Sequence, residues 1–222
     1  MTTQNKRKEI RYIAVEGVIG AGKTTLATLL AERLNADLVL EQFEINPFLE
    51  KFYKDRRRYA FQTQIFFLVN RYIQQQNILQ ANLFKPYLVS DYIFEKDRIF
   101  ASINLEGDEL KLYETLASQL EKNILKPDLV IYLQSSVDRL MENIRKRDRT
   151  FERNIQRSYI EQLNEAYNHF FFAYKFTPLL IVNTNDIDFL NNKEDLENLI
   201  QLIFREDRAY IEYYSPKAKG LL

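Results

Sequence analysis

The sequence predicts an α/β fold in which a five-stranded parallel sheet is flanked by helices. Short runs of β-branched and aromatic residues alternate with longer segments of helical periodicity, as in parallel sheets covered by helices. The first apolar run leads into a glycine-rich turn and then directly into a helix. The chain has 222 residues, of which 46% are hydrophobic, so it can bury a substantial core. We therefore expect residues 1–222 to form a single domain, with the tail 206–222 left unassigned.

Five apolar runs are expected to form the strands, at residues 10–16, 38–41, 87–91, 129–133 and 179–183. Seven other segments have the spacing of helices, at residues 24–34, 47–53, 59–80, 109–125, 137–147, 159–174 and 193–205. The longest helix is predicted to pack through one apolar face, formed by Ile65, Leu68, Val69, Tyr72 and Ile73.

A phosphate-binding loop is predicted between the first strand and the first helix. Four residues separate Gly17 from Gly22-Lys23-Thr24, which is the spacing of a P-loop. Glycines allow backbone N–H groups to converge on phosphate oxygens, and the helix directs its positive end toward the same anion. Lys23 would reach the outer phosphates, and the Thr24 hydroxyl would bind Mg²⁺. The residues expected to bind the triphosphate are Gly17, Val18, Ile19, Gly20, Ala21, Gly22, Lys23, Thr24 and Thr25.

Two carboxylates end predicted strands that should flank this loop. Ligands of open α/β sheets bind beyond the carboxyl ends of the strands, where Glu41 and Asp91 are expected. Asp91 is suited to hold Mg²⁺ through water, and Glu41 is placed to take a proton from an acceptor. The alternatives are that Glu41 caps the next segment and that Asp91 forms a turn. The only histidine, His169, lies in a predicted helix far from any strand end, so a carboxylate is expected as the base.

The segment 145–153 is rich in arginine and lies between two predicted helices. Small-molecule kinases cover their phosphates with such a lid, whose arginines stabilise charge on the transferring phosphoryl group. An arginine delivered to a transferring phosphoryl group contributes roughly 10³–10⁵ in rate. A solvated charged face is the alternative for this segment. Switch GTPases are disfavoured, because the segment 183–186 (Asn-Thr-Asn-Asp) lacks the lysine of a guanine-binding Asn-Lys-x-Asp motif.

Composition excludes several other classes of protein. Thirty-one Lys and Arg residues balance thirty-one Asp and Glu residues, so no overall charge favours nucleic acid or an anionic membrane. The absence of cysteine excludes disulfides, thiolate metal sites and cysteine nucleophiles. Neither a membrane-spanning apolar run nor the apolar part of a secretion signal is visible, so we expect a cytoplasmic enzyme.

Taken together, these segments resemble the deoxynucleoside kinase family, and in particular bacterial deoxyadenosine and deoxyguanosine kinases. The resemblance runs from the P-loop to about Phe189 and includes residues 46–53, 59–64 and 91–101, the lid and residues 185–189. It implies a P-loop kinase fold, ATP as the phosphate donor, Mg²⁺ as the cofactor and a homodimer. It also implies transfer of phosphate to the 5′-hydroxyl of a deoxynucleoside, with purines weakly favoured, for nucleotide salvage.

The resemblance implies a role for individual residues as well. Glu41 resembles the base for the 5′-hydroxyl, and Tyr53 with Glu152 resembles the pair that holds the 3′-hydroxyl. Gln62 and Asp97 would recognise the base, with Phe61 and Phe100 stacking on it. Ordinary core packing of the phenylalanines, a solvent-facing Gln62 and a structural Tyr53 are the alternatives. Lid residues Arg147 and Arg149 would contact the donor, with Arg153 a weaker candidate. The donor's adenine would lie against Asn185, Asp186 and Phe189.

The sequence also departs from the family pattern at two arginines. Many relatives follow the acid of the third strand with Arg-Ser, whereas here Asp91 is followed by Tyr92-Ile93. A second family arginine, on the long helix, aligns with Val69. The residues that could supply the missing charge after Asp91 are Lys96, Arg98 and Arg71.

Two other functions remain open from the sequence. One is a thymidylate-type nucleoside monophosphate kinase, which would need basic residues aimed at the phosphate of its acceptor. The other is a non-catalytic family member that acts as an assembly subunit, although the intact P-loop and lid disfavour it. The preferred base is also open.

Overall fold

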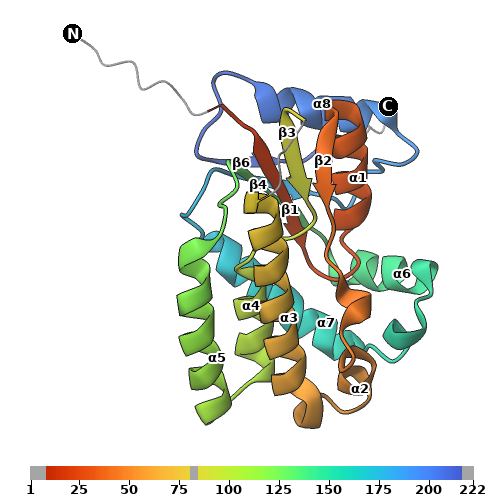
Figure 1. Ribbon diagram of the computed structural model, residues 1–222. Helices are drawn as coiled ribbons and strands as arrows, with labels where there is room; N and C mark the ends of the chain where they lie inside the picture. The colour runs from red at the N-terminus through yellow and green to blue at the C-terminus, as the bar shows by residue number, and fades with distance from the viewer. Residues whose placement is uncertain (1–8, 81–84, 217–222) are drawn as a thin grey trace.

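A six-stranded parallel sheet organises the computed structural model, which describes residues 9–80 and 85–216 (Figure 1). The strand order is β2-β3-β1-β4-β5-β6, and every neighbouring pair is parallel. The strands are β1 (Tyr12–Gly17), β2 (Ala36–Val39), β3 (Tyr87–Ser90), β4 (Leu129–Gln134), β5 (Leu179–Asn183) and β6 (Ile211–Tyr214). The predicted α/β class is confirmed, but the predicted number of strands, five, is wrong.

The additional strand, β6, lies in the tail that the sequence left unassigned, of which residues 217–222 are outside the described part. It pairs in parallel with β5 at the edge of the sheet. Its buried Glu212 accepts hydrogen bonds from the Arg205 side chain and the Ala209 backbone. A buried carboxylate is tolerated only with such partners. Glu212 meets these hydrogen-bond partners only in the folded protein. The local sequence pattern therefore does not identify β6 as a strand.

Eight helices are described in these residues: α1 (Lys23–Leu34), α2 (Leu49–Lys54), α3 (Arg56–Gln80), α4 (Lys96–Asn104), α5 (Gly107–Leu120), α6 (Val137–Arg147), α7 (Arg157–Phe172) and α8 (Lys193–Phe204). Seven of these helices were predicted, and most of their ends lie within a few residues of the predicted ends. The bounds of α6 are the predicted ones. The sequence missed α4, because its buried face includes Lys96 and Asp97 and therefore lacks a clean apolar stripe.

The predicted packing face of α3 is partly wrong. Leu68 is buried, but Val69 and Ile73 are 44% and 50% exposed. The side of α3 that faces the interior instead carries the polar residues Gln64, Arg71 and Gln75, each at most 2% exposed. Two of them, Gln64 and Arg71, line the site described below, so the polar side of α3 is the one that faces inward.

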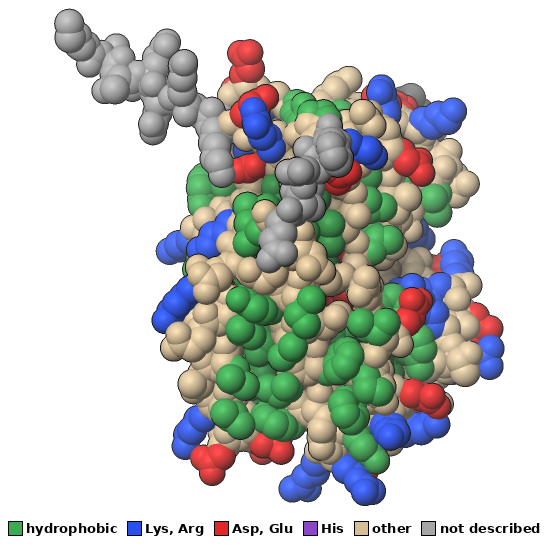
Figure 2. Space-filling view, in the orientation of Figure 1, with side chains coloured by type: hydrophobic (Ala, Val, Ile, Leu, Met, Phe, Trp, Pro, Cys, Tyr) green, Lys and Arg blue, Asp and Glu red, His purple; other side chains and the backbone are tan. Residues whose placement is uncertain are grey.

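Exposed apolar side chains gather over α3 and α5 on one face of the molecule (Figure 2). We call Val69, Ile73, Leu112 and Leu116 the α3–α5 patch; each is 40–50% exposed. The two helices pack against each other, which makes the patch continuous. Within residues 9–80 and 85–216, no helix is both long and apolar enough to cross a membrane.

The carboxyl ends of the strands face the half of the molecule built from α2, α3, α4 and α7 (Figure 1). The central strands β1 and β4 are almost fully buried, which anchors this edge in the core. Glu41 and Asp91 each follow a strand end, after β2 and β3, as predicted, although β2 and β3 end one or two residues earlier than expected. The parallel arrangement therefore brings three chain segments together at one edge.

Candidate active site

The phosphate-binding loop joins β1 to α1 at this edge. Gly20 and Gly22 have φ angles of 89° and 91°, in the left-handed region that favours glycine. A Cβ on Gly20 would also lie 2.7 Å from the backbone oxygen of Leu140 in α6, so the loop packs closely on that helix. Because Gly22 directly precedes α1, the free N–H groups of the first helical turn open onto the loop.

A cavity, which we call the donor cavity, opens beside this loop. Gly17 and Val18 do not line it: Gly17 belongs to β1 and packs against Leu133, and Val18 is buried. Ile19 lines a second cavity instead. The donor cavity is lined by Gly20, Ala21, Gly22, Lys23, Thr24, Thr25, Arg139, Asn143, Arg147, Arg149, Thr184, Ile187, Asp188, Phe189 and Leu190.

Thr24 and Asp91 are in direct contact beside the loop. The Thr24 hydroxyl donates a hydrogen bond of 2.6 Å to one carboxylate oxygen of Asp91. The other oxygen accepts the backbone N–H of Glu41 at 2.7 Å. Mg²⁺ at nucleotide sites takes oxygen ligands, usually one or two from protein together with phosphate oxygens. The pair therefore has the right donor atoms for the predicted metal site.

Lys23 lies between the loop and these acids. Its ammonium group donates to the Val18 carbonyl at 3.2 Å. Burial, followed by the nearby charge of Lys96, lowers the pKa of Lys23 to about 8, although three carboxylates oppose this shift. An anion beside Lys23 would favour the charged form of its ammonium group, so a bound phosphate would raise the pKa of Lys23 and pair with it.

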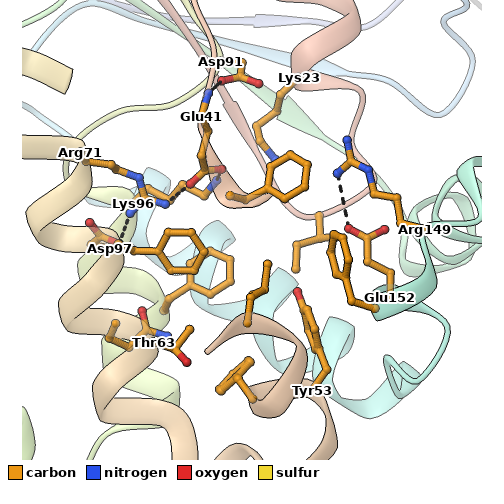
Figure 3. A pocket seen from close by; sticks show the side chains of 18 of the residues that line it. Lys23, Glu41, Tyr53, Thr63, Arg71, Asp91, Lys96, Asp97, Arg149 and Glu152 are labelled. Carbon is orange, nitrogen blue, oxygen red and sulfur yellow. Dashed lines mark hydrogen bonds and ion pairs between the residues drawn. The ribbon is translucent and has the colours of Figure 1, made fainter. Parts of the chain in front are cut away.

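A second cavity, which we call the acceptor cavity, encloses about 730 Å³ including its open mouth (Figure 3). It shares Lys23, Thr24, Arg147 and Arg149 with the donor cavity. Its other lining residues are Ile19, Glu41, Phe43, Leu49, Phe52, Tyr53, Thr63, Gln64, Phe67, Arg71, Asp91, Lys96, Asp97, Phe100, Phe151 and Glu152.

Glu41 points into the acceptor cavity between two cations (Figure 3). Arg71 from α3 donates to Oε1, and the Lys96 ammonium donates to Oε2 at 2.6 Å. Burial alone would raise the pKa of Glu41, but the charges and hydrogen bonds of Arg71 and Lys96 hold it well below its usual range. The carboxylate is therefore ionised at neutral pH and fixed in orientation.

The inner end of the cavity carries buried groups suited to recognising a planar polar ligand. Arg71 forms an ion pair with Asp97 as well as with Glu41. Among the described side chains, Gln64 Oε1 and Asp97 Oδ2 are buried without a hydrogen-bond partner. Because both residues line the cavity, these two acceptor atoms are available to hydrogen-bond a ligand there. Phe67 and Phe100 add aromatic surface to the same cavity.

Two of the predicted base-binding residues are not in this cavity. Gln62 is exposed, and Phe61 is half-buried against the core. Gln64 lies two positions further along α3, and two helical residues rotate a side chain by about 200°. Gln64 therefore lines the cavity where Gln62 was expected to do so, and Phe67, six positions after Phe61, lines it as well. The structure thus corrects these two predictions, while Asp97 and Phe100 line the cavity as expected.

The outer wall of the cavity is formed by α2 and the lid. Tyr53 points its hydroxyl into the cavity, and its ring stacks on Phe151 of the lid with a centroid distance of 6.2 Å (Figure 3). The buried Glu152 accepts two hydrogen bonds from Arg147, at 2.6 and 2.7 Å, and lies 3.6 Å from Arg149. The lid arginines and Glu152 are therefore brought together, as predicted for the lid between α6 and α7.

The segment after β5 only partly follows its prediction. Phe189 lines the donor cavity, but Asn185 and Asp186 do not. The Asn185 side chain accepts the Ser136 backbone N–H at 2.8 Å, and Asp186 lines a separate surface hollow beside α8. The two residues are thus structural or solvent-facing, because the turn after β5 directs them away from the donor cavity. Asp188 and Leu190 line it instead.

A family model described as deoxynucleoside kinase matches residues 13–206, which is most of the chain. The chain belongs to the deoxynucleoside kinase family. Among curated relatives, the deoxyguanosine kinase of Bacillus subtilis is 37% identical over 193 residues, covering 85% of this chain and 93% of the relative. The deoxyadenosine/deoxycytidine kinase of the same organism is 33% identical over 198 residues, covering 86% and 90%.

Solved structures agree with this assignment. The deoxyadenosine kinase from M. mycoides, solved with bound dATP, matches with a TM-score of 0.77 and 27% identity, covering 86% of this chain and 98% of that one. The fold is therefore that of a P-loop kinase. Membership of the deoxynucleoside kinase family makes the chain an enzyme that phosphorylates deoxynucleosides, with ATP as the phosphate donor.

The arginine pattern of this deoxynucleoside kinase is also clearer in the structure. Val69 belongs to the exposed α3–α5 patch, and Arg71, two residues later, lies in the cavity. The same two-residue offset separates Gln62, which was predicted to bind the base, from Gln64, which lines the cavity. A single error of two residues in the predicted register of α3 therefore accounts for both Val69 and Gln62. Arg98 turns away to pair with Glu114 and Glu121.

Proposed function

We propose that the enzyme transfers the γ-phosphoryl group of ATP to the 5′-hydroxyl of a deoxynucleoside, with purine deoxynucleosides preferred. The observation that carries this proposal is the junction of the two cavities. Lys23, Thr24, Arg147 and Arg149 line both of them. A phosphoryl group leaving a donor in one cavity would therefore meet an acceptor in the other, with cations on either side.

In this proposal Glu41 orients the acceptor hydroxyl and receives its proton. An ionised carboxylate accepts a hydrogen bond from the hydroxyl and directs its oxygen toward the phosphorus. Because the pKa of Glu41 is low, it is a weak base for the free alcohol. In the loose transition state of phosphoryl transfer the hydroxyl loses its proton late, so positioning contributes more than basicity.

The lid arginines serve the transferring phosphoryl group. Arg147 is held by Glu152, and Arg149 lies over the Phe43 ring with its guanidinium carbon 4.2 Å from the centroid. Both side chains thus lie at the boundary of the two cavities. When phosphate is present, these guanidinium groups would stabilise the charge that develops during transfer. Tyr53 and Glu152 would hold the 3′-hydroxyl of the sugar from the same wall.

The preference for purines rests on the inner end of the cavity and on the relatives. Gln64 offers a donor and an acceptor, and Asp97 offers an acceptor, so together they match the amino and ring-nitrogen edge of a purine. Phe67 and Phe100 would stack on the base. The relatives named above act on deoxyguanosine and deoxyadenosine, and one of them also on deoxycytidine.

Mg²⁺ would be held by Thr24 and Asp91 together with phosphate oxygens of the nucleotide. When bound, the cation neutralises phosphate charge and helps to orient the triphosphate. Asp91 would keep its second role of accepting the Glu41 backbone N–H, which joins the metal site to the acceptor site.

A phosphate-transfer assay with labelled ATP tests this function. We expect phosphorylation of deoxyadenosine or deoxyguanosine to exceed that of thymidine, and the deoxynucleosides to exceed their monophosphates as acceptors. Of the five cations that line the acceptor cavity in the described part of the chain, all but Lys23 are paired with a carboxylate: Arg71, Lys96, Arg147 and Arg149. They therefore favour a neutral acceptor. Preferential phosphorylation of a monophosphate would support the thymidylate-type alternative and contradict our proposal.

The second alternative, a non-catalytic assembly subunit, is tested with Lys23→Ala. The variant should lose phosphate transfer, and with it the cellular salvage of deoxynucleosides. Unchanged cellular function of the inactive variant would favour the structural role.

We further propose that the enzyme is a homodimer that associates through the α3–α5 patch. Contiguous apolar surface of this kind marks interaction sites on soluble proteins. Light scattering should give twice the 26.6 kDa mass of one chain. Ile73→Asp should produce monomers, whereas Phe172→Asp, on the 84% exposed residue at the end of α7, should leave the dimer intact. A monomeric wild type would contradict this assignment.

We also propose that the enzyme works in the cytoplasm. Its lack of cysteine means that it gains nothing from an oxidising compartment, and ATP is abundant inside the cell. Fractionation of the source cells should recover it with cytoplasmic enzymes, and recovery in the exported fraction would contradict this.

A further inference from the structure

The residue after Asp91 leaves the cavity without the arginine that many relatives carry there. Tyr92 is fully buried, and its ring lies beside Arg71 rather than in the cavity lining. We propose that Lys96, from the first turn of α4, is the positioning residue that orients Glu41 toward the acceptor hydroxyl in place of that arginine. This inference rests on the function proposed above and deepens it.

The backbone that carries Lys96 is fixed by a buried acid. Glu16, at the end of β1, accepts the Ile93 backbone N–H at 3.0 Å and the Gly17 backbone N–H at 2.8 Å. The Lys96 backbone N–H in turn bonds to the Ile93 carbonyl at 3.3 Å. Glu16 therefore ties the start of the phosphate-binding loop to the turn that begins α4. As a result, Lys96 has a defined place relative to the phosphates.

The two cations on Glu41 have different freedom. Arg71 is shared between Glu41 and Asp97, so its guanidinium is held at both ends. The Lys96 side chain is only 6% exposed and bonds to Glu41 at 2.6 Å, which uses one of its three N–H donors. Lys96 lines the cavity, and its ammonium nitrogen lies 5.8 Å from the centroid of the Phe100 ring, which lines the same cavity. Lys96 is thus the cation that can hold Glu41 and contact an acceptor oxygen together.

Lys96 lies among charged groups from several elements. Its charge acts on Lys23 of α1 and Glu16 of β1, and its ammonium group bonds to Glu41, which follows β2. Arg71 faces Glu41 from α3. An arginine at position 96 would keep a positive charge among these groups, whereas a neutral side chain would remove it.

The test compares Lys96→Met and Lys96→Gln with Lys96→Arg, measuring kcat and KM for a deoxynucleoside and for ATP. We expect the two neutral variants to lose about 100-fold or more in kcat, the range of a positioned acid–base group, with KM for ATP within a few-fold. Lys96→Arg keeps the positive charge beside Glu41 and should recover at least a tenth of the wild-type kcat.

The control is Arg98→Met, two residues further along α4, whose side chain pairs with Glu114 and Glu121 outside the cavity. It should retain wild-type kcat. Thermal unfolding monitored by circular dichroism identifies variants that do not fold. A polar replacement (Lys96→Gln) and an apolar one (Lys96→Met) are both used, so that one folded neutral variant is enough for the test. If neither neutral variant folded, the test would depend on Lys96→Arg alone. A folded Lys96→Arg protein without activity would overturn the role proposed for Lys96.

Neutral variants that stay within threefold of wild-type kcat, or a folded Lys96→Arg variant that loses as much kcat as the neutral variants, would overturn the proposal for Lys96. Those outcomes leave the proposed function standing, because the wild type would still phosphorylate the deoxynucleoside. If the wild type itself phosphorylated no deoxynucleoside, the proposed function would fail first.

Discussion

The donor cavity and the acceptor cavity are built in different ways. The donor cavity is built around six consecutive residues, Gly20 to Thr25, whose backbone conformation and helix start form the phosphate-binding loop; its other nine lining residues come from α6, the lid and the segment after β5. The acceptor cavity is formed by side chains from α2, α3, α4, the segment after β2 and the lid. A backbone site depends on local sequence, whereas a side-chain site depends on which face each helix turns inward. The following predictions test this difference, from the largest expected effect to the smallest.

The boundary between the cavities should be the most sensitive region. Replacing Arg147 and Arg149 together with alanine should lower kcat by about 10³ or more, because arginines on a transferring phosphoryl group contribute that much. The matched control is Arg153→Ala in the same lid, since Arg153 pairs with Asp148 at the surface. Steady-state kinetics measure both. If the double variant and Arg153→Ala lost the same amount of kcat, the total positive charge of the lid, rather than the position of Arg147 and Arg149, would determine the rate.

Glu41→Gln should lower kcat by about 10²–10⁴, since the amide is nearly isosteric but cannot receive the proton. ATP affinity, measured by calorimetry, should change little, because the donor cavity does not include Glu41. Near-normal turnover would refute the role of Glu41. A large loss of ATP affinity would mean that the two cavities are not separable.

Gln64→Ala and Gln62→Ala form a matched pair that tests the rotation of α3. Loss of a buried hydrogen bond to the base costs about 1–3 kcal/mol, so Gln64→Ala should lower kcat/KM for the preferred deoxynucleoside by about 10- to 100-fold. Gln62→Ala, at an exposed position, should match the wild type across the four deoxynucleosides. The opposite result would restore the register expected from the sequence.

The pH dependence of ATP binding should report on Lys23. In the free protein its pKa is lowered to about 8, and bound phosphate favours the ammonium form. Binding therefore takes up a proton above pH 8, so the Kd for ATP should be flat below pH 8 and should rise up to about tenfold per pH unit above it. Arginine stays charged over this pH range, so Lys23→Arg should remove the rise of the Kd for ATP above pH 8. A flat wild-type profile to pH 10 would contradict this.

Tyr53→Phe should have the smallest effect. It removes one hydroxyl from the wall of the acceptor cavity while keeping the ring stacked on Phe151. The preference for a deoxynucleoside over its 3′-deoxy analogue, measured as a ratio of kcat/KM values, should fall several-fold, since a net hydrogen bond contributes about 1 kcal/mol. An unchanged ratio would make Tyr53 a packing residue.

Much of the fold was predictable because its signals are local. The P-loop spacing, the apolar strands β1, β3, β4 and β5, and the position of the lid each appear as a contiguous pattern. Glu41, Asp91 and Asp97 were also predicted to be near the site, and the structure places all three in one cavity. The strand β6 was missed because its buried Glu212 finds partners only in the folded protein.

The sequence by itself determined the phosphate-binding loop from Gly20 to Thr25, because a glycine turn and a helix start specify where backbone N–H groups point. Only the tertiary structure decided which residues of α3 line the acceptor cavity. On α3 the apolar residues Val69 and Ile73 face outward, while Gln64 and Arg71 face inward. That rotation, like the placement of Lys96 against Glu41, is set by buried polar groups whose partners lie far away in the chain. No local pattern records such pairs, since desolvated charges are stable only where the fold brings their counterparts together.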